Sequence, residues 1–252
     1  MPLARLTRTA WLHKKFEYMP GDSIGLYGST GTGKTTFAYQ IAEEAMRQNP
    51  GMAFNAFQPK PADVTTMEAA ERLNLKITPY WPPRKKLLEA KPNGHIHWPN
   101  HVTSDADADA EHLSKAFKQS LNSVYWKGNT LAFVDDELLF FGKYKCRQEL
   151  EQFLIAGRSN DAGLMFALQA PKGSPQSSVS GYHFSQPRWL IWHRENVESN
   201  REKYADVACG IDPKLIMATV GGLKTYRMGE GNVSEALIID RTGPYPAIVS
   251  PW

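Results

Sequence analysis

The sequence has few cysteines and no long apolar run, and each deficit excludes a class of protein. It contains two cysteines, Cys146 and Cys209, in 252 residues. So few cysteines exclude a disulfide-built scaffold and are typical of a reducing compartment. No apolar run reaches the roughly 18 residues of a spanning helix, so we expect no stable membrane insertion. The basic segment 1–16 lacks the apolar core of a signal peptide, so we expect a cytoplasmic protein.

The sequence also lacks a large excess of either charge. Lys and Arg together number 29, Asp and Glu 26, and the net charge is +3. This mild basic excess is compatible with a polyanionic partner but does not require one. The length and the 42% hydrophobic content suit one globular α/β domain, which we predict for residues 1–252.

Glycine is concentrated in one loop that is typical of a phosphate-binding site. The stretch GLYGSTGTGKTTFAYQ, residues 25–40, contains the complete pattern G-x-x-x-x-G-K-[ST]. Glycines allow successive backbone N–H groups to turn towards an anion, and the following helix contributes its N-terminus. The predicted ATP-binding residues are Gly28, Ser29, Thr30, Gly31, Thr32, Gly33, Lys34, Thr35 and Thr36.

The segments around this loop have the required order of strand, loop and helix. An apolar run at 23–27 precedes the loop, and a helical pattern at 34–48 follows it. Lys34 is expected to reach the β- and γ-phosphates, and the Thr35 hydroxyl to bind Mg²⁺.

Elsewhere, apolar runs alternate with helical patterns, which predicts a mostly parallel sheet flanked by helices. The longest predicted helix covers 104–127, with Ser104 as its N-cap. Three further segments are predicted from composition: an irregular, proline-rich insertion at 60–100, a flexible loop at 171–181 and a C-terminal β-hairpin within 220–252.

A second group of candidate residues follows the apolar run 131–134. Asp135 comes first after this run, where ligands bind in open α/β sheets, and is predicted to hold Mg²⁺. Either Asp136 or Glu137 is expected to activate the attacking water, and the longer reach of Glu137 slightly favours it. About a hundred residues separate Lys34 from Asp135, which predicts an extra strand between their two strands.

Two further features carry polar side chains of interest. Gln169 ends the apolar run LMFAL and is predicted to sense the γ-phosphate and the attacking water. His95 and His97 would share one face of a strand, but no cysteine or carboxylate accompanies them at a metal-binding spacing, so ordinary polar surface is expected there.

These segments together resemble the FtsK/HerA superfamily of DNA-pumping ATPases. The similar stretches are LAFVDDELLFF and LEQFLIAGRSNDAGLMFALQAP, with AFNAFQPKPAD resembling the second strand of that superfamily. The resemblance covers roughly residues 20–240. It implies a RecA-like P-loop fold of the type with an additional catalytic acid strand. The family has Glu where this chain has Asp136, which leaves the choice of base between Asp136 and Glu137 open.

Within the superfamily, the short chain best resembles the genome-packaging ATPases of membrane-containing icosahedral viruses and phages. This resemblance implies an Mg²⁺-dependent ATP hydrolase that moves double-stranded DNA into a preformed capsid. It also implies a homo-oligomeric ring, with six subunits expected, and capsid or portal vertex proteins as partners. The expected location is the host cytoplasm or the virion vertex.

The family likeness further implies that an arginine enters the neighbouring subunit's site. Arg158, in the Gly157-Arg158 dipeptide, is the candidate, and Arg188 and Arg194 are its rivals. The basic runs 84–86 and 143–147 are candidates for contact with DNA.

Two other functions remain open at this point. A nucleotide-dependent assembly or secretion ATPase of the morphogenesis type would share the P-loop, although such proteins usually carry a membrane helix. A small-molecule kinase would need a lid rich in arginine, and only the basic run at 84–86 is a candidate for such a lid.

Overall fold

The computed structural model describes residues 3–60, 62–83, 92–169, 181–207, 210–228, 231–243 and 246–252. Most of the predicted loop 171–181, the basic run 84–86 and Cys209 lie outside these residues. Within the described part, no helix is long and apolar enough to cross a membrane.

Helices and strands alternate along most of the chain, as the apolar patterning predicts. The helices are α1 (Arg8–Lys14), α2 (Lys34–Gln48), α3 (Val64–Arg72), α4 (Ala106–Lys127), α5 (Glu137–Gly142), α6 (Arg147–Ala156), α7 (Tyr182–Ser185), α8 (Glu198–Asp206) and α9 (Pro213–Gly222), with a 3₁₀ turn η1 (Gly157–Asn160). The strands are β1 (Ala4–Thr7), β2 (Ile24–Tyr27), β3 (Ala53–Phe57), β4 (Leu75–Thr78), β5 (Gly94–His97), β6 (Thr130–Val134), β7 (Ala162–Leu168), β8 (Trp189–His193), β9 (Thr225–Met228), β10 (Gly231–Ser234), β11 (Ala236–Asp240) and β12 (Ala247–Ser250).

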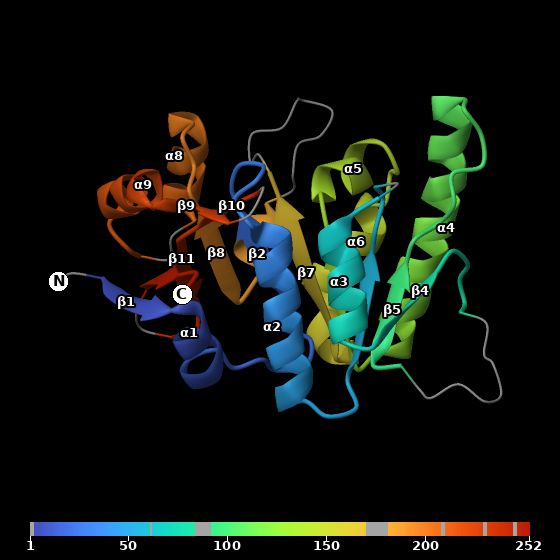
Figure 1. Cartoon of the computed structure of the whole chain (residues 1–252), viewed down its shortest axis with the longest axis horizontal. Coiled ribbons are helices and arrows are strands. Elements are labelled where there is room, and N and C mark those ends of the chain that lie inside the picture. Colours follow the sequence, from blue (N-terminus) through green and yellow to red (C-terminus); the bar gives the residue numbers. More distant parts are fainter. Residues whose placement is uncertain are drawn as a thin grey trace.

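A ten-stranded sheet in the order β1-β12-β11-β8-β2-β7-β6-β3-β5-β4 runs through the molecule (Figure 1). From β8 to β4 all neighbouring strands are parallel, whereas β11 is antiparallel to β8. The strand β7 lies between β2 and β6. The predicted α/β fold, with an extra strand between the P-loop strand and the acid strand, is therefore confirmed.

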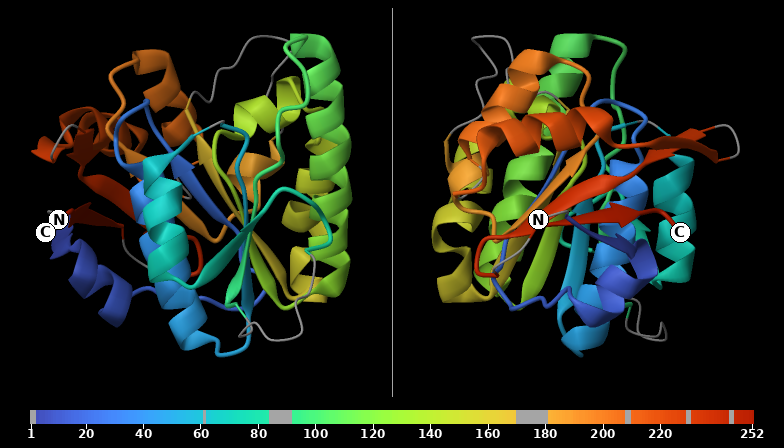
Figure 2. Two further views of the ribbon diagram at one scale, coloured as in Figure 1. Left: turned by 45° about the vertical axis from the view of Figure 1, so that its right-hand side comes forward. Right: turned by 90° about the vertical axis from the view of Figure 1, so that its left-hand side faces the viewer.

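Helices cover both faces of the sheet, which explains why the central strands β2, β6, β7 and β8 are buried at every position. On one face, apolar residues of α1, α2 and α3 pack against alternate strand residues such as Leu26 and Phe133. On the other face, α4 to α9 pack against the residues between them, such as Tyr27 and Val134. Figure 2 shows the two layers of helices with the sheet between them.

The N-cap of the long helix α4 lies one residue later than predicted. Asp105, not Ser104, is the N-cap, and its carboxylate accepts hydrogen bonds from the backbone N–H groups of Asp107 and Ala108. Aspartate caps a helix as well as serine does and adds a negative charge at the positive end of the helix dipole.

The segment 60–100 is more regular than predicted. It contains the helix α3 and two parallel strands, β4 and β5, which complete one end of the large sheet. Only the proline-rich stretch 79–83 fits the predicted irregular insertion among its described residues. The composition is misleading because β4 and β5 have only 4 residues each, too few to form a recognisable apolar run.

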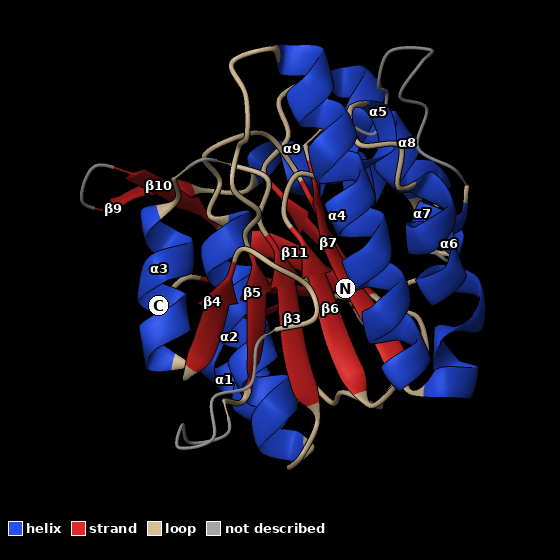
Figure 3. Ribbon diagram, turned by 90° about the vertical axis from the view of Figure 1, so that its right-hand side faces the viewer, coloured by secondary structure: helices blue, strands red, loops and turns tan. Residues whose placement is uncertain are grey.

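The predicted C-terminal hairpin is formed by β9 and β10, which pair antiparallel with Thr225 opposite Ser234. The hairpin projects from the body of the protein (Figure 3). The residues beyond it return to the large sheet, where β12 lies antiparallel to β11 and parallel to β1. Both end segments of the chain therefore lie side by side in the sheet.

His97 is not on a polar surface, contrary to the expectation from sequence. Its side chain is 1% exposed, its Nδ1 lies 2.8 Å from the hydroxyl of Ser120, and its ring packs against Trp81 and Phe117. Burial lowers the pKa of His97 from 6.5 to about 4. Among the described residues, no cluster of three or more His, Cys, Asp or Glu is placed to hold a metal ion.

We predict that His97 makes the fold sensitive to acid. Because the pKa of His97 is lowered in the folded state, the unfolded chain binds the extra proton between about pH 6.5 and 4. Stability is therefore fully present above pH 6.5 and falls through this window, by about 3 kcal/mol for this group. Chemical denaturation of His97→Gln should show a smaller loss of unfolding free energy between pH 6.5 and 4 than the wild type shows, by that amount. The reason is that glutamine keeps a polar group but has no charge to bury.

The exposed His112→Gln is the matched control and should follow the wild-type profile. If the unfolding free energies of His97→Gln and the wild type fell in parallel with pH, His97 would not be the source of the acid sensitivity.

Candidate nucleotide site

The predicted P-loop lies between β2 and α2, at the carboxyl edge of the parallel strands. Gly28 and Gly33 have positive φ angles of 140° and 82°. A side chain at Gly28 would also meet His193 of β8, whose Cβ would be 2.8 Å from the added atom. The loop therefore needs glycine at these positions both for its backbone path and for its close approach to the neighbouring strand.

Lys34 is held inside the loop that it is predicted to serve. Its Nζ donates to the carbonyl oxygens of Gly28 and Ser29, at 2.7 and 2.8 Å. The side chain is nearly buried, and this burial lowers the pKa of Lys34 to about 8, against the opposing effect of Asp135. A polyphosphate in the loop would supply the negative charge that this buried ammonium lacks.

Thr35 and Asp135 are brought together as predicted, although 100 residues separate them. The Thr35 hydroxyl donates to Oδ1 of Asp135 at 3.2 Å. A hydroxyl beside a carboxylate, both near a phosphate-binding loop, is a donor set of hard oxygens that fits Mg²⁺. These two residues would hold the metal, which would partly neutralise the charge of the phosphates when bound.

Gln169 links the P-loop to the acids after β6. Its Oε1 accepts from the hydroxyl of Thr30 at 2.9 Å, and its Nε2 donates to Oδ2 of Asp136 at 3.1 Å. One amide therefore contacts residues from both sides of β7. Burial, with a further contribution from Asp135, raises the pKa of Asp136, which makes its carboxylate a better proton acceptor.

Glu137 does not lie in this cluster, contrary to the slight preference for it from sequence. Its carboxylate is fully buried on the face of the sheet that α4 to α9 cover, where Oε1 lies 2.6 Å from Nε2 of His183 in α7. The residue starts α5 after Asp136, whose left-handed backbone (φ 63°) turns the chain so that successive side chains point to different places. Asp136 is thus the carboxylate that the structure brings to the P-loop edge.

Two charged residues at this edge were not predicted from the sequence motifs. Lys60, after β3, forms an ion pair with Asp135, and Glu195, after β8, accepts a hydrogen bond from the Ser29 hydroxyl at 3.3 Å. Lys60 lies three residues beyond the end of β3 and Glu195 two residues beyond the end of β8. Each loop leaves the carboxyl edge of the parallel strands, but only the pairing of the strands brings these side chains to the site.

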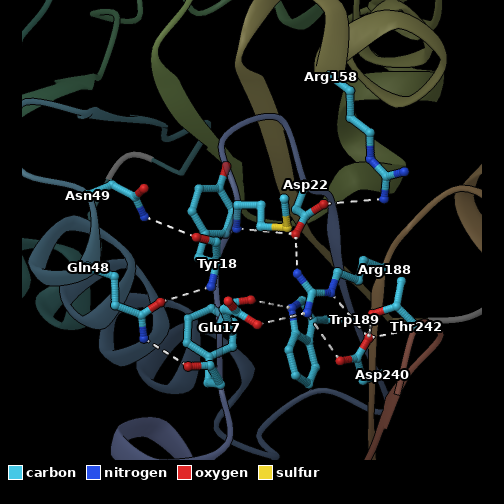
Figure 4. A network of polar contacts seen from close by, with 12 residues as sticks. Glu17, Tyr18, Asp22, Gln48, Asn49, Arg158, Arg188, Trp189, Asp240 and Thr242 are labelled. Atoms are coloured by element: carbon cyan, nitrogen blue, oxygen red, sulfur yellow. Dashed lines mark hydrogen bonds and ion pairs between the residues drawn. The ribbon is translucent and has the colours of Figure 1, made fainter. Parts of the chain in front are cut away.

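The candidate arginines are divided between the two edges of the sheet. Arg158 and Arg188 precede β7 and β8 and lie at the edge opposite the P-loop, where both contact Asp22 (Figure 4). Arg188 is buried and also bonds Asp240, whereas Arg158 is 66% exposed and has one contact of 3.3 Å. Arg188 therefore links Asp22 to Asp240 inside the fold, and Arg158 is the one of the two whose side chain is exposed at the surface.

Arg194 follows β8 and lies on the P-loop edge, next to Glu195. Its Nε donates to the side chain of Asn196 at 3.2 Å, and its backbone N–H is 3.4 Å from the Ser234 hydroxyl. Arg194 therefore lies near the candidate nucleotide site of the same chain.

Comparison with solved structures identifies the fold, although the sequence matches no family model and no curated protein. The genome-packaging NTPase B204 of Sulfolobus turreted icosahedral virus 2, solved with AMP, superposes with a TM-score of 0.58 at 16% identity, over 93% of this chain and 100% of that one. The chain has the fold of these P-loop ATPases. VirB4 of Thermoanaerobacter pseudethanolicus gives a TM-score of 0.62 at 8% identity, covering 90% and 88% of the two chains.

EssC (ATPases 2 and 3) of Geobacillus thermodenitrificans gives 0.51 at 13% identity, over 94% of this chain and 41% of that one. At these identities the likeness establishes the fold, which is the P-loop fold that the resemblance seen in the sequence implies.

We predict that Asp136 and Glu137 respond differently to removal of their charge. Asp136→Asn should lower ATP turnover by roughly 100-fold while ATP binding is retained, because a positioned base is lost. Glu137→Gln should lower the melting temperature, because the buried contact with His183 loses its carboxylate, and should leave turnover within a few-fold of wild type. Turnover, nucleotide affinity and thermal melting of both variants test this. Loss of turnover in Glu137→Gln with unchanged melting would reverse the assignment.

Proposed function

We propose that the chain is a single ATPase domain that hydrolyses Mg-ATP to translocate double-stranded DNA, and that it packages a viral genome into a preformed capsid. The proposal depends chiefly on the continuous contact from Thr30 through Gln169 to Asp136, which joins a phosphate-binding loop to a carboxylate of raised pKa. Such an arrangement suits activation of water beside a γ-phosphate.

Each residue of the site has a separate role in the proposed hydrolysis. Lys34 and the loop backbone bind the phosphates, and Thr35 and Asp135 hold the Mg²⁺. The carboxylate of Asp136 accepts a proton from the attacking water, and the Gln169 amide orients this water. The amide can then transmit the loss of the γ-phosphate from Thr30 to the strand β7.

DNA as the substrate is supported by the likeness to B204, a genome-packaging NTPase matched over nearly all of both chains. A basic turn near the site offers a contact for a phosphate backbone. Lys143 and Lys145 are exposed between α5 and α6, and α5 connects them directly to Asp136. Movement at the acids on hydrolysis would therefore move this turn.

The cofactors are ATP and Mg²⁺, and the partners are DNA and the capsid or portal vertex. We place the protein in the host cytoplasm or at the virion vertex. A homo-oligomeric ring, with six subunits expected, would bring Arg158 of one subunit to the nucleotide of the next.

An assembly or secretion ATPase is the second candidate. The same fold is shared with VirB4 and EssC, so the fold alone does not select the substrate.

The first test is ATP turnover of the full chain with and without linear double-stranded DNA. We expect DNA to raise turnover severalfold, Lys34→Ala to abolish it, and salt to weaken the stimulation, because phosphate contacts release counterions. The double variant Lys143→Ala/Lys145→Ala should lose the stimulation and keep the basal rate. Turnover that ignores DNA would favour the assembly or secretion ATPase, and transfer of labelled γ-phosphate to a small molecule would favour a kinase.

We also predict that Arg158 acts between subunits. In a ring, two different faces of the subunit meet, so an exposed arginine at the edge opposite the P-loop can face the neighbour's P-loop. Arg158→Ala and Lys34→Ala should each be inactive alone and should regain turnover when mixed, because mixed interfaces contain one intact site. Arg194→Ala, on the P-loop edge, should not regain turnover with Lys34→Ala. Absence of recovery for Arg158→Ala, or recovery for Arg194→Ala alone, would contradict the proposed role.

A further inference from the structure

The carboxylate that is predicted to bind the metal already has a cation beside it. Nζ of Lys60 lies 2.9 Å from Oδ2 of Asp135, while the Thr35 hydroxyl lies 3.2 Å from Oδ1. The Asp135 side chain is 7% exposed, so this ion pair is shielded from solvent on the side of the carboxylate. Both oxygens of Asp135 are therefore engaged by groups of the protein.

The backbone of Lys60 is fixed at two points, which aims its side chain at Asp135. Its N–H donates to Oε1 of Gln58 at 3.0 Å, and its carbonyl oxygen accepts from the indole N–H of Trp98 at 2.6 Å. Gln58 is itself 2% exposed and donates to the Thr66 hydroxyl at 2.9 Å. The contact with Asp135 is thus built into the loop after β3 and does not depend on a freely moving surface lysine.

We propose that Lys60 is a positioning residue that competes with the divalent cation for Asp135, so that the metal binds well only together with the nucleotide. A divalent cation held by the Asp135 carboxylate would lie close to the Lys60 ammonium, and the two positive charges would repel each other at low dielectric. The inference rests on the proposed function only in taking Asp135 as the metal-binding carboxylate.

The nucleotide changes this balance because it brings negative charge. Its phosphates would give the displaced ammonium of Lys60 a new partner and would supply further oxygen ligands for the metal. Lys60 would thereby prevent the site from taking up a metal ion by itself, and it would hold Asp135 in place until the metal–nucleotide complex arrives.

The test is the affinity of the full chain for Mn²⁺ without nucleotide, read from the electron paramagnetic resonance signal of free Mn²⁺. Removal of the competing charge in Lys60→Met should tighten Mn²⁺ binding by roughly tenfold relative to wild type. Lys60→Arg, which keeps the charge, should bind as weakly as wild type. The exposed Lys14→Met on α1 makes the same change of net charge elsewhere and should also match wild type.

Adding Asp135→Asn to Lys60→Met should remove the gained affinity, which assigns the bound ion to this carboxylate. Equal Mn²⁺ affinity in wild type and Lys60→Met, or a gain that survives Asp135→Asn, would overturn the inference. If Lys60→Met fails to fold because Asp135 is left unpaired, Lys60→Gln provides the same loss of charge with a hydrogen-bond donor retained. The assay uses neither ATP turnover nor DNA, so a failure of the proposed function would appear only in the turnover experiments.

Discussion

The parallel alignment of β2, β7 and β6 is the constraint on which the candidate site depends. Hydrogen bonding between these strands brings their carboxyl ends to one edge of the sheet. The polar residues that follow the three strands then lie within hydrogen-bonding distance, although Thr30, Asp136 and Gln169 are far apart in the chain. Because β7 lies in the middle, its terminal Gln169 can contact both neighbours at once.

The site concentrates charge in a place from which water is largely removed. Lys34 and Asp135 are both nearly buried, and the carboxylate of Asp136 lies beside them. Burial disfavours charge, and each ion is tolerated because an opposite charge or a carbonyl dipole is close. Charges arranged in this way respond strongly to an incoming polyanion and cation, as the proposed hydrolysis of Mg-ATP requires.

The opposite edge of the sheet is held by a separate network of charges. Arg188 joins Asp22, before β2, to Asp240, at the end of β11, and so connects the parallel strands to the antiparallel strands beyond β8 (Figure 4). Its exposed neighbour Arg158 shares Asp22. An arginine that acts on another subunit would thus share its partner, Asp22, with the buried Arg188 that links the two parts of the sheet.

The amino-acid sequence is sufficient to predict the P-loop and the acid strand, because each depends on a local pattern: a glycine spacing, or an apolar run and the polar residue that follows it. The extra strand between them follows from the long spacing between Lys34 and Asp135. The sequence also determined α2, whose predicted bounds 34–48 are those observed. The tertiary structure alone decided which of two adjacent acids reaches the site, because a left-handed turn at Asp136 sends Glu137 towards His183. It alone brought Lys60 to Asp135, since a contact between residues 75 positions apart depends on how strands pair and not on any local pattern.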